Sequence, residues 1–171
     1  MSAVEKPKVL YHGSPNGQID EFVPHSKESR DESPAVYATP DKYLAMMFMH
    51  KNMGLVGHFG DIPYGILFGS REECEHNDHD GHLYTLPSDT FELNHNRGLQ
   101  GREWVSHNPV KPMQVQKYDS TIDTMLKEGV QVYIMDRQMY NEIKASSDHG
   151  QEILRNVQSE NQHRGINIRP F

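Results

Sequence analysis

The sequence contains one cysteine, fewer basic than acidic residues and no long apolar run. Because Cys74 is the only cysteine among 171 residues, no disulfide can form within the chain. Acidic residues outnumber Lys and Arg by 24 to 17, and the formal net charge is −7. A chain of this charge has no general attraction for phosphate backbones, so we expect no tight, non-specific nucleic-acid binding.

Apolar segments are short throughout the chain. None approaches the length of about 20 residues that a membrane-spanning helix needs, and residues 1–9 contain no apolar core of a signal peptide. We therefore expect a cytoplasmic protein without a membrane partner. Hydrophobic residues make up 35% of the chain. This predicts a modest core in a single domain over residues 1–171, with flexible tails at residues 1–7 and 164–171.

The pattern of apolar runs and turn residues predicts many short strands and few helices. Strands are expected at residues 8–11, 35–38, 62–69, 82–86, 90–93, 102–106, 113–118 and 130–135. Helices are expected at residues 40–52, 121–127, 138–144 and 151–162, the first with Thr39 as its N-cap. Loops are expected at residues 16–33, 53–61, 70–81 and 94–101. This order is typical of an α+β domain and not of a parallel βαβ sheet.

The first strand ends in His12, Gly13 and Ser14, a combination that can hold a flat polar ligand. A glycine lets a ligand approach the main chain closely, and its N–H and C=O can pair with a carboxamide. The Ser14 hydroxyl can add a third hydrogen bond. Taken alone, the motif is more typical of a strand that ends in a glycine turn and leaves His12 exposed.

Tyr37 and Glu103 are two further candidate residues. Tyr37 lies between small residues at a strand end, where its ring can stack on a planar ligand or pack in the core. Glu103 shares a strand face with Val105, opposite the face of Trp104. A carboxylate on such a half-buried face is costly unless a neighbouring Arg or Lys pairs with it or the chemistry uses it.

In this order, the three motifs resemble the ADP-ribosyltransferase superfamily, and more narrowly its His-Tyr-Glu branch of diphtheria-type toxins and poly-ADP-ribose polymerases. The resemblance covers roughly residues 9–118. It implies two small packed β-sheets with flanking helices and an NAD⁺ cleft between them. It also implies that His12 binds the ribose of the adenosine half of NAD⁺. Gly13 and Ser14 would hold the nicotinamide amide, and Tyr37 would stack on the nicotinamide ring.

The same resemblance assigns the catalytic role to Glu103, which would bind the 2′-hydroxyl of the nicotinamide ribose and stabilise its developing positive charge. The family places a second aromatic residue, usually tyrosine, eleven positions after the first. That position is Phe48, which keeps the ring and lacks the hydroxyl, and Tyr43 in the same helix is the competing candidate. Some branches define the acceptor with Gln or Glu two positions before the catalytic glutamate. Gly101 stands there and leaves the acceptor undefined.

The resemblance implies transfer of ADP-ribose from NAD⁺, a consumed substrate, to an acceptor with release of nicotinamide. The chemistry is coherent, since a carboxylate near C1′ stabilises an oxocarbenium-like state, as in glycoside hydrolysis. The acceptor, macromolecular or small, stays open. Hydrolysis of NAD⁺ at the same site is the nearest alternative. A catalytically silent module that binds a nucleotide or a protein is another.

A separate segment, residues 74–82, is dense in metal-ligand residue types. Cys74 precedes His76, His79 and His82, which recur every three residues. Asn, Asp and Gly between them make the segment a loop, in which spacing alone does not define a coordination geometry. We therefore expect a solvated insertion and no metal site. A metallohydrolase built on these residues is the rival enzyme class.

Overall fold

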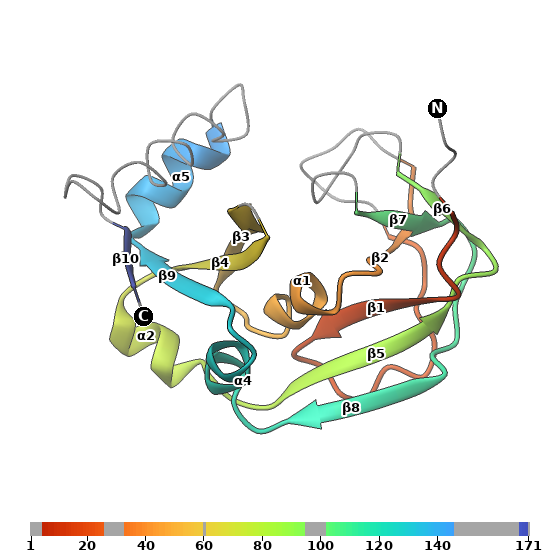
Figure 1. The fold of residues 1–171 in the computed structure, drawn as a ribbon, viewed down its shortest axis with the longest axis horizontal. Helices are drawn as coiled ribbons and strands as arrows, with labels where there is room; N and C mark the ends of the chain where they lie inside the picture. The colour runs from red at the N-terminus through yellow and green to blue at the C-terminus, as the bar shows by residue number, and fades with distance from the viewer. Residues whose placement is uncertain (1–4, 26–32, 60, 95–101, 146–167, 171) are drawn as a thin grey trace.

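Three small β-sheets and a few short helices form the part of the chain that the computed structural model describes, residues 5–25, 33–59, 61–94, 102–145 and 168–170 (Figure 1). The fold is a mixed α+β arrangement, as expected. None of the helices among these residues combines the length and the apolar character that crossing a bilayer requires.

Two of the sheets are antiparallel and lie at one end of the molecule (Figure 1). The first has the order β1 (Val9–Ser14), β5 (Gly81–Pro87), β8 (Gln114–Tyr118). The other has the order β2 (Val36–Ala38), β7 (Trp104–Ser106), β6 (Phe91–Leu93). They are joined where Tyr11 and Thr39 exchange two backbone hydrogen bonds of 2.8 and 3.0 Å. The resemblance predicts two sheets, whereas the structure has three. The difference arises because a single bridge is all that joins β1 to β2.

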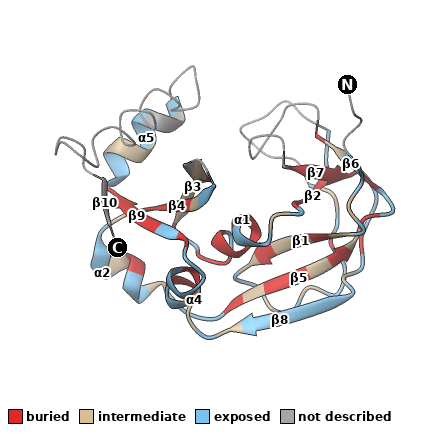
Figure 2. Cartoon of the chain, in the orientation of Figure 1, coloured by how far each residue is buried: buried red, intermediate tan, exposed pale blue. Residues whose placement is uncertain are grey.

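These two sheets share one apolar cluster, which explains why their strands read as short apolar runs. The cluster consists of Leu10, Phe22, Val36, Ala38, Tyr84, Leu86, Phe91, Trp104 and Val110. In these two sheets, Figure 2 shows buried residues on β1, β5, β2 and β7, whereas β8 is almost entirely exposed. Each fully buried large side chain stabilises the fold by roughly 1.5–3 kcal/mol.

The remaining sheet has the order β10 (Ile168–Pro170), β9 (Gln131–Met135), β4 (Ile62–Phe68), β3 (Met53–Phe59). The pair β4–β9 is parallel, and the other pairs are antiparallel. One face packs on α1 (Lys42–Met47), α2 (Arg71–His76) and α4 (Thr121–Lys127). The other face packs on α5 (Arg137–Ala145), where the Tyr140 ring stacks on Phe68 with centroids 4.6 Å apart.

Helix α1 lies between the two halves of the molecule (Figure 1). Leu44 and Met47 pack with the four-stranded sheet, whereas Ala45 and Met46 pack with Leu83 of β5. The helix is thus buried on two sides. Its placement therefore couples the two halves and positions the residues that α1 presents to the first sheet.

Several expected boundaries are wrong. Strand β1 runs through Gly13 and does not end in a turn there. The N-cap of α1 is Asp41, not Thr39, because the Asp41 carboxylate accepts hydrogen bonds from the N–H groups of Tyr43 and Leu44. The helix itself ends at Met47, well before residue 52.

Two segments expected to be loops are regular structure. Residues 53–59 form β3, in which Gly54 and Gly57 serve close contact: a Cβ on Gly54 would lie 2.7 Å from the Tyr140 ring, and one on Gly57 would lie 2.8 Å from the Tyr64 hydroxyl. Residues 71–76 form α2, which Ser70 caps. Residues 168–170 pair with β9 within the expected C-terminal tail. The helix expected at residues 151–162 lies outside the described residues.

Candidate active site

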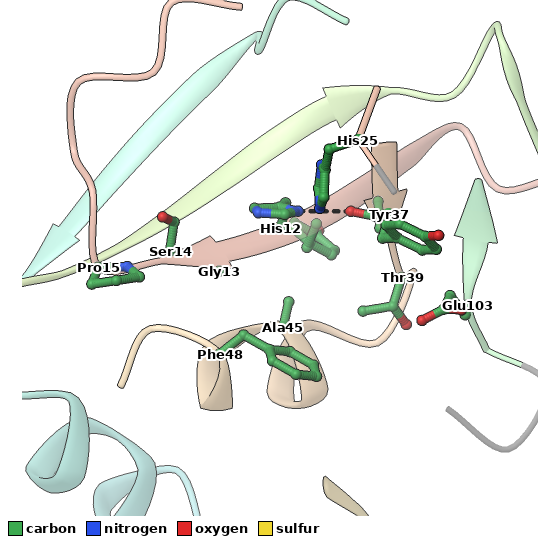
Figure 3. Close-up of a pocket in the computed structure, with 12 residues that line it drawn as sticks. His12, Gly13, Ser14, Pro15, His25, Tyr37, Thr39, Ala45, Phe48 and Glu103 are labelled. Carbon is green, nitrogen blue, oxygen red and sulfur yellow. Dashed lines mark hydrogen bonds between the residues drawn. The ribbon is translucent and has the colours of Figure 1, made fainter. Parts of the chain in front are cut away.

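A pocket of about 330 Å³ opens between β1, β2, α1 and the segment that leads into β7 (Figure 3). This volume lies in the range of small-molecule sites. The sequence-predicted residues that line it are His12, Gly13, Ser14, Tyr37, Phe48 and Glu103. The pocket therefore gathers residues up to 92 positions apart in the chain, from Tyr11 to Glu103.

Gly13 presents its backbone to the pocket. Strand β1 is the edge of its sheet and pairs with β5 on its other side. Tyr11 directs its N–H and C=O to the free edge, toward Thr39. Because backbone groups alternate along an antiparallel strand, Gly13, two residues further on, directs its N–H and C=O to the same edge. A donor and an acceptor thus stand side by side at the pocket, as pairing with a carboxamide requires.

His12 is held by contacts on two sides. Its Nδ1–H donates to the carbonyl oxygen of Tyr37 over 2.7 Å, since a carbonyl can only accept. Its ring lies against Phe22, with the centroids 4.7 Å apart. In the neutral imidazole this tautomer makes Nε2 an acceptor, suited to a ligand hydroxyl.

Tyr37 is buried, and its ring packs with Ala35 and Val105. His25 meets this ring edge-on, with the centroids 5.8 Å apart, and also lines the pocket. Figure 3 shows His25 beside the hydrogen bond that joins His12 to Tyr37. The two imidazoles and the phenol thus form one wall of the pocket.

The structure distinguishes between the two aromatic candidates, Tyr43 on α1 and Phe48 just after it. Phe48, the C-cap of the helix, lines the pocket, and 41% of its surface is exposed. Tyr43 is exposed to a similar extent and is not among the residues that line the pocket. Figure 3 shows the Phe48 ring below β1, across the pocket from Tyr37.

Glu103 lies immediately before β7 and is almost fully buried, with 4% of its surface exposed. The expected alternation holds beyond it: Trp104 joins the apolar cluster, whereas Val105 packs with Tyr37. The Asn94 Nδ2 donates to Glu103 Oε1 over 2.7 Å. Figure 3 shows the carboxylate directed toward Thr39. A buried carboxylate is costly, and such a hydrogen bond offsets part of that cost.

The charge in the pocket is sparse. Among the described residues that line it, Glu103 is the only carboxylate, His12 and His25 are the only imidazoles, and neither Lys nor Arg is present. An anionic group against aromatic and apolar walls suits a ligand that carries or develops positive charge, because low polarity strengthens the interaction.

A polar cluster of residues outside the pocket lining connects two of the elements that form the pocket. His58 on β3 donates from Nε2 to Asp41 Oδ2 over 3.1 Å. Arg102 donates from Nη1 to Nδ1 of the same His58 ring over 3.2 Å. Asp41 begins α1, and Arg102 precedes Glu103. The cluster therefore connects the helix that carries Ala45 and leads to Phe48 with the segment that carries the buried carboxylate.

The segment at residues 74–82 has a structural role. His76 ends α2, His79 lies exposed between elements, and His82 is in β5. Burial raises the pKa of the Cys74 thiol to about 11, which opposes its use as a thiolate ligand. No three His, Cys, Asp or Glu side chains within the described ranges are grouped to hold a metal ion.

Asp78 from the same segment caps α4. Its Oδ1 accepts from the N–H groups of Thr121 and Ile122 over 2.9 and 3.1 Å. The density of polar residues in this segment thus reflects a capping contact and a short helix.

Residues that the sequence did not single out complete the site. They are Tyr11, Pro15, His25, Ala38, Thr39 and Ala45 in the pocket, and Asn94 beside Glu103. Neither His25 nor Asn94 belongs to a recurring motif, and each reaches the site through strand pairing. His25 pairs with Ala35 and Asn94 with Glu103, and because only the structure reveals these pairings, no sequence signal identifies the two residues.

Comparisons with known proteins do not assign this chain to a group: no family model, no curated protein sequence and no solved structure matches it.

Proposed function

We propose that the chain is an ADP-ribosyltransferase that cleaves the nicotinamide–ribose bond of NAD⁺, with a fold of the ADP-ribosyltransferase type. The observation that carries the proposal is the shared pocket of His12, Gly13, Ser14, Tyr37, Phe48 and Glu103. These residues were selected from the sequence as the contacts of one ligand, NAD⁺. Their convergence on one cavity supports the selection.

In this proposal, the nicotinamide end of NAD⁺ occupies the part of the pocket beside Gly13. The carboxamide pairs with the Gly13 N–H and C=O, and the Ser14 hydroxyl adds a hydrogen bond. The nicotinamide ring lies between the aromatic side chains of Tyr37 and Phe48. His12 accepts a hydrogen bond at Nε2 from the ribose of the adenosine half.

The bond between C1′ and the nicotinamide nitrogen breaks heterolytically. The electron pair goes to the nitrogen, so that nicotinamide leaves as a neutral molecule and positive charge develops on the ribose. The Glu103 carboxylate, which binds the ribose 2′-hydroxyl, stabilises that charge. The acceptor nucleophile then bonds to C1′ and releases its proton to solvent. The buried position of Glu103 keeps this interaction in surroundings of low polarity, where it is strongest.

The acceptor distinguishes the transferase from its nearest alternative. If water takes the place of the acceptor, the same site is an NAD⁺ glycohydrolase. In a silent module that binds a nucleotide, Glu103 would only accept hydrogen bonds from the ligand, and no nicotinamide would be released. A cytoplasmic location belongs to the proposal as well, since Cys74 is a buried free thiol that needs no oxidising surroundings.

The test is nicotinamide release from NAD⁺ by the purified protein, compared with the Glu103→Gln variant. Glu92→Gln is the matched control, because Glu92 is an exposed carboxylate on neighbouring β6. We expect release by the wild type and the control, and a loss of at least about 100-fold in Glu103→Gln. Equal release by wild type and Glu103→Gln would disprove the assignment of Glu103.

Two additions to this assay separate the alternatives. If cell lysate increases release and labelled ADP-ribose appears on a lysate component, the protein is a transferase. If free ADP-ribose accumulates at the same rate without lysate, it is a glycohydrolase. Release abolished by a chelator and restored by Zn²⁺ would favour the metallohydrolase instead.

A further inference from the structure

Asn94 and Glu103 are attached to each other by two hydrogen bonds beside the pocket. The Asn94 N–H donates to the Glu103 carbonyl over 2.9 Å, and its Nδ2 donates to Glu103 Oε1 over 2.7 Å. Both side chains are buried, with 7% and 4% of their surfaces exposed. We propose that Asn94 is a positioning residue that orients the Glu103 carboxylate toward the ribose of NAD⁺. This inference rests on the proposed function, in which Glu103 is the catalytic group.

The placement of Asn94 follows from the register of β6 and β7. Leu93 lies opposite Trp104 in this antiparallel pair, so the next residues outward, Asn94 and Glu103, are cross-strand neighbours. Their backbone bond extends the ladder by one step. The backbone pairing of the two strands therefore places the Asn94 amide beside the Glu103 carboxylate.

The chemistry of the amide suits this role. The last torsion of a glutamate side chain is broad, so an unsupported carboxylate rotates freely. A hydrogen bond to Oε1 restricts that rotation and presents Oε2 in a defined direction. Because the amide is neutral, it orients the carboxylate without offsetting its negative charge, as a paired Lys or Arg would.

The first test removes the amide. In Asn94→Ala, we expect kcat for nicotinamide release to fall about 10- to 100-fold, the loss of a hydrogen bond to a charged group. KM for NAD⁺ should change less than about threefold, because Asn94 acts on Glu103 and not on bound NAD⁺. The control is Asn52→Ala, which removes another buried, hydrogen-bonded amide, away from the pocket. It should lower stability without this selective fall in kcat.

The second test uses a variant of the same size, Asn94→Asp, which also serves if Asn94→Ala fails to fold. The introduced carboxyl group can donate to Glu103 while it is protonated, as the amide does, whereas its ionised form repels Glu103. We expect kcat of Asn94→Asp to approach the wild-type value at pH 5 and to fall as the pH rises to 8. The wild type should not lose activity over this interval. If Asn94 had only a structural role, kcat of Asn94→Asp would not fall in this way as the pH rises.

The outcomes separate this inference from the proposed function. If the wild type releases nicotinamide and Glu103→Gln does not, the proposed function stands. In that case a kcat within twofold of wild type in Asn94→Ala, or a flat pH profile in Asn94→Asp, overturns the role of Asn94 alone. If the wild type releases no nicotinamide under any condition, the proposed function and the role of Asn94 fall together.

Discussion

Gly13 of β1 and Ala45 of α1 approach each other so closely that a side chain at position 13 has no room. A Cβ built on Gly13 would lie 1.8 Å from the carbonyl oxygen of Ala45. The described glycines with positive φ are Gly69 and Gly129, so Gly13 is required for space and not for backbone conformation. The same glycine presents its backbone to the pocket. Its lack of a side chain therefore serves both the packing of α1 and access by a ligand.

Gly13→Ala should consequently damage both stability and activity. We expect an overpacking cost of about 1–3 kcal/mol in the free energy of unfolding, together with loss of nicotinamide release, because β1 and α1 must separate. Gly129→Ala is the matched control: it meets no atom within 4 Å and is strained only through its φ of +81°. It should cost about 1 kcal/mol and leave release intact. Urea unfolding and the release assay measure the two effects, and full activity in Gly13→Ala would contradict the expected site.

The two aromatic candidates on and beside α1 can be distinguished by truncation. Phe48→Ala should lower kcat/KM for NAD⁺ about three- to tenfold, the value of a ring stack, because Phe48 lines the pocket. Phe48→Tyr, which keeps a ring at this position, should have a kcat/KM close to that of the wild type. Tyr43→Ala removes a ring of similar exposure outside the pocket lining and should have little effect. Steady-state kinetics decide the matter, and the reverse ranking would assign the stacking role to Tyr43.

Asp41 should matter for both folding and activity. It caps α1 and also accepts from His58, which Arg102 in turn contacts. Asp41→Ala should therefore lower the free energy of unfolding by about 1–2 kcal/mol and reduce nicotinamide release.

Ser70→Ala provides the comparison for Asp41→Ala, since Ser70 caps α2 away from the pocket. It should reduce stability by a similar amount and leave release unchanged. Thermal melts and the release assay test the pair. Equal activity of the two variants would show that Asp41 acts through its cap alone.

His50 should make the protein less stable in acid. Its Nε2–H donates to the Cys74 carbonyl, its Nδ1 accepts from the Asn52 N–H, and burial lowers its pKa below the ordinary value of 6.5. The hydrogen bond to the Cys74 carbonyl and the nearby Asp78 carboxylate oppose this shift, and His79 adds to it. The unfolded state therefore binds more protons than the folded state between the two pKa values.

The contribution of His50 to stability is thus complete above about pH 6.5 and is lost as the pH falls from there through the lowered pKa. Urea unfolding between pH 5 and 8 measures it. The wild type should lose more stability over this interval than His50→Gln, in which the titrating group is absent. Parallel curves for the two proteins would contradict the assignment.

Much of the strand pattern could be predicted from the sequence, because short apolar runs between turn residues mark β1, β4, β5 and β9. Strand β3 could not be predicted, because Gly54 and Gly57 resemble loop residues until the rings of Tyr140 and Tyr64 are seen against them. Helix α2 was missed for a similar reason. Its sequence is polar except for Cys74, and only packing identifies Cys74 as its inward side.

The candidate site follows the same division. His12, Gly13, Tyr37 and Glu103 were selected from the sequence by the order of three short motifs and the resemblance that this order carries, since each motif taken alone also fits an ordinary strand end or core residue. The choice of Phe48 over Tyr43 and the positions of His25 and Asn94 required the structure.

The sequence by itself therefore determined the α+β class and the chemical groups at hand, because both depend on residue type and local periodicity. Only the tertiary structure decided that these groups share one pocket, that Gly13 has to be glycine, and that Asn94 stands beside Glu103. Those facts depend on strand register and on the approach of α1 to β1. They are set by packing between residues far apart in the chain, which no local pattern records.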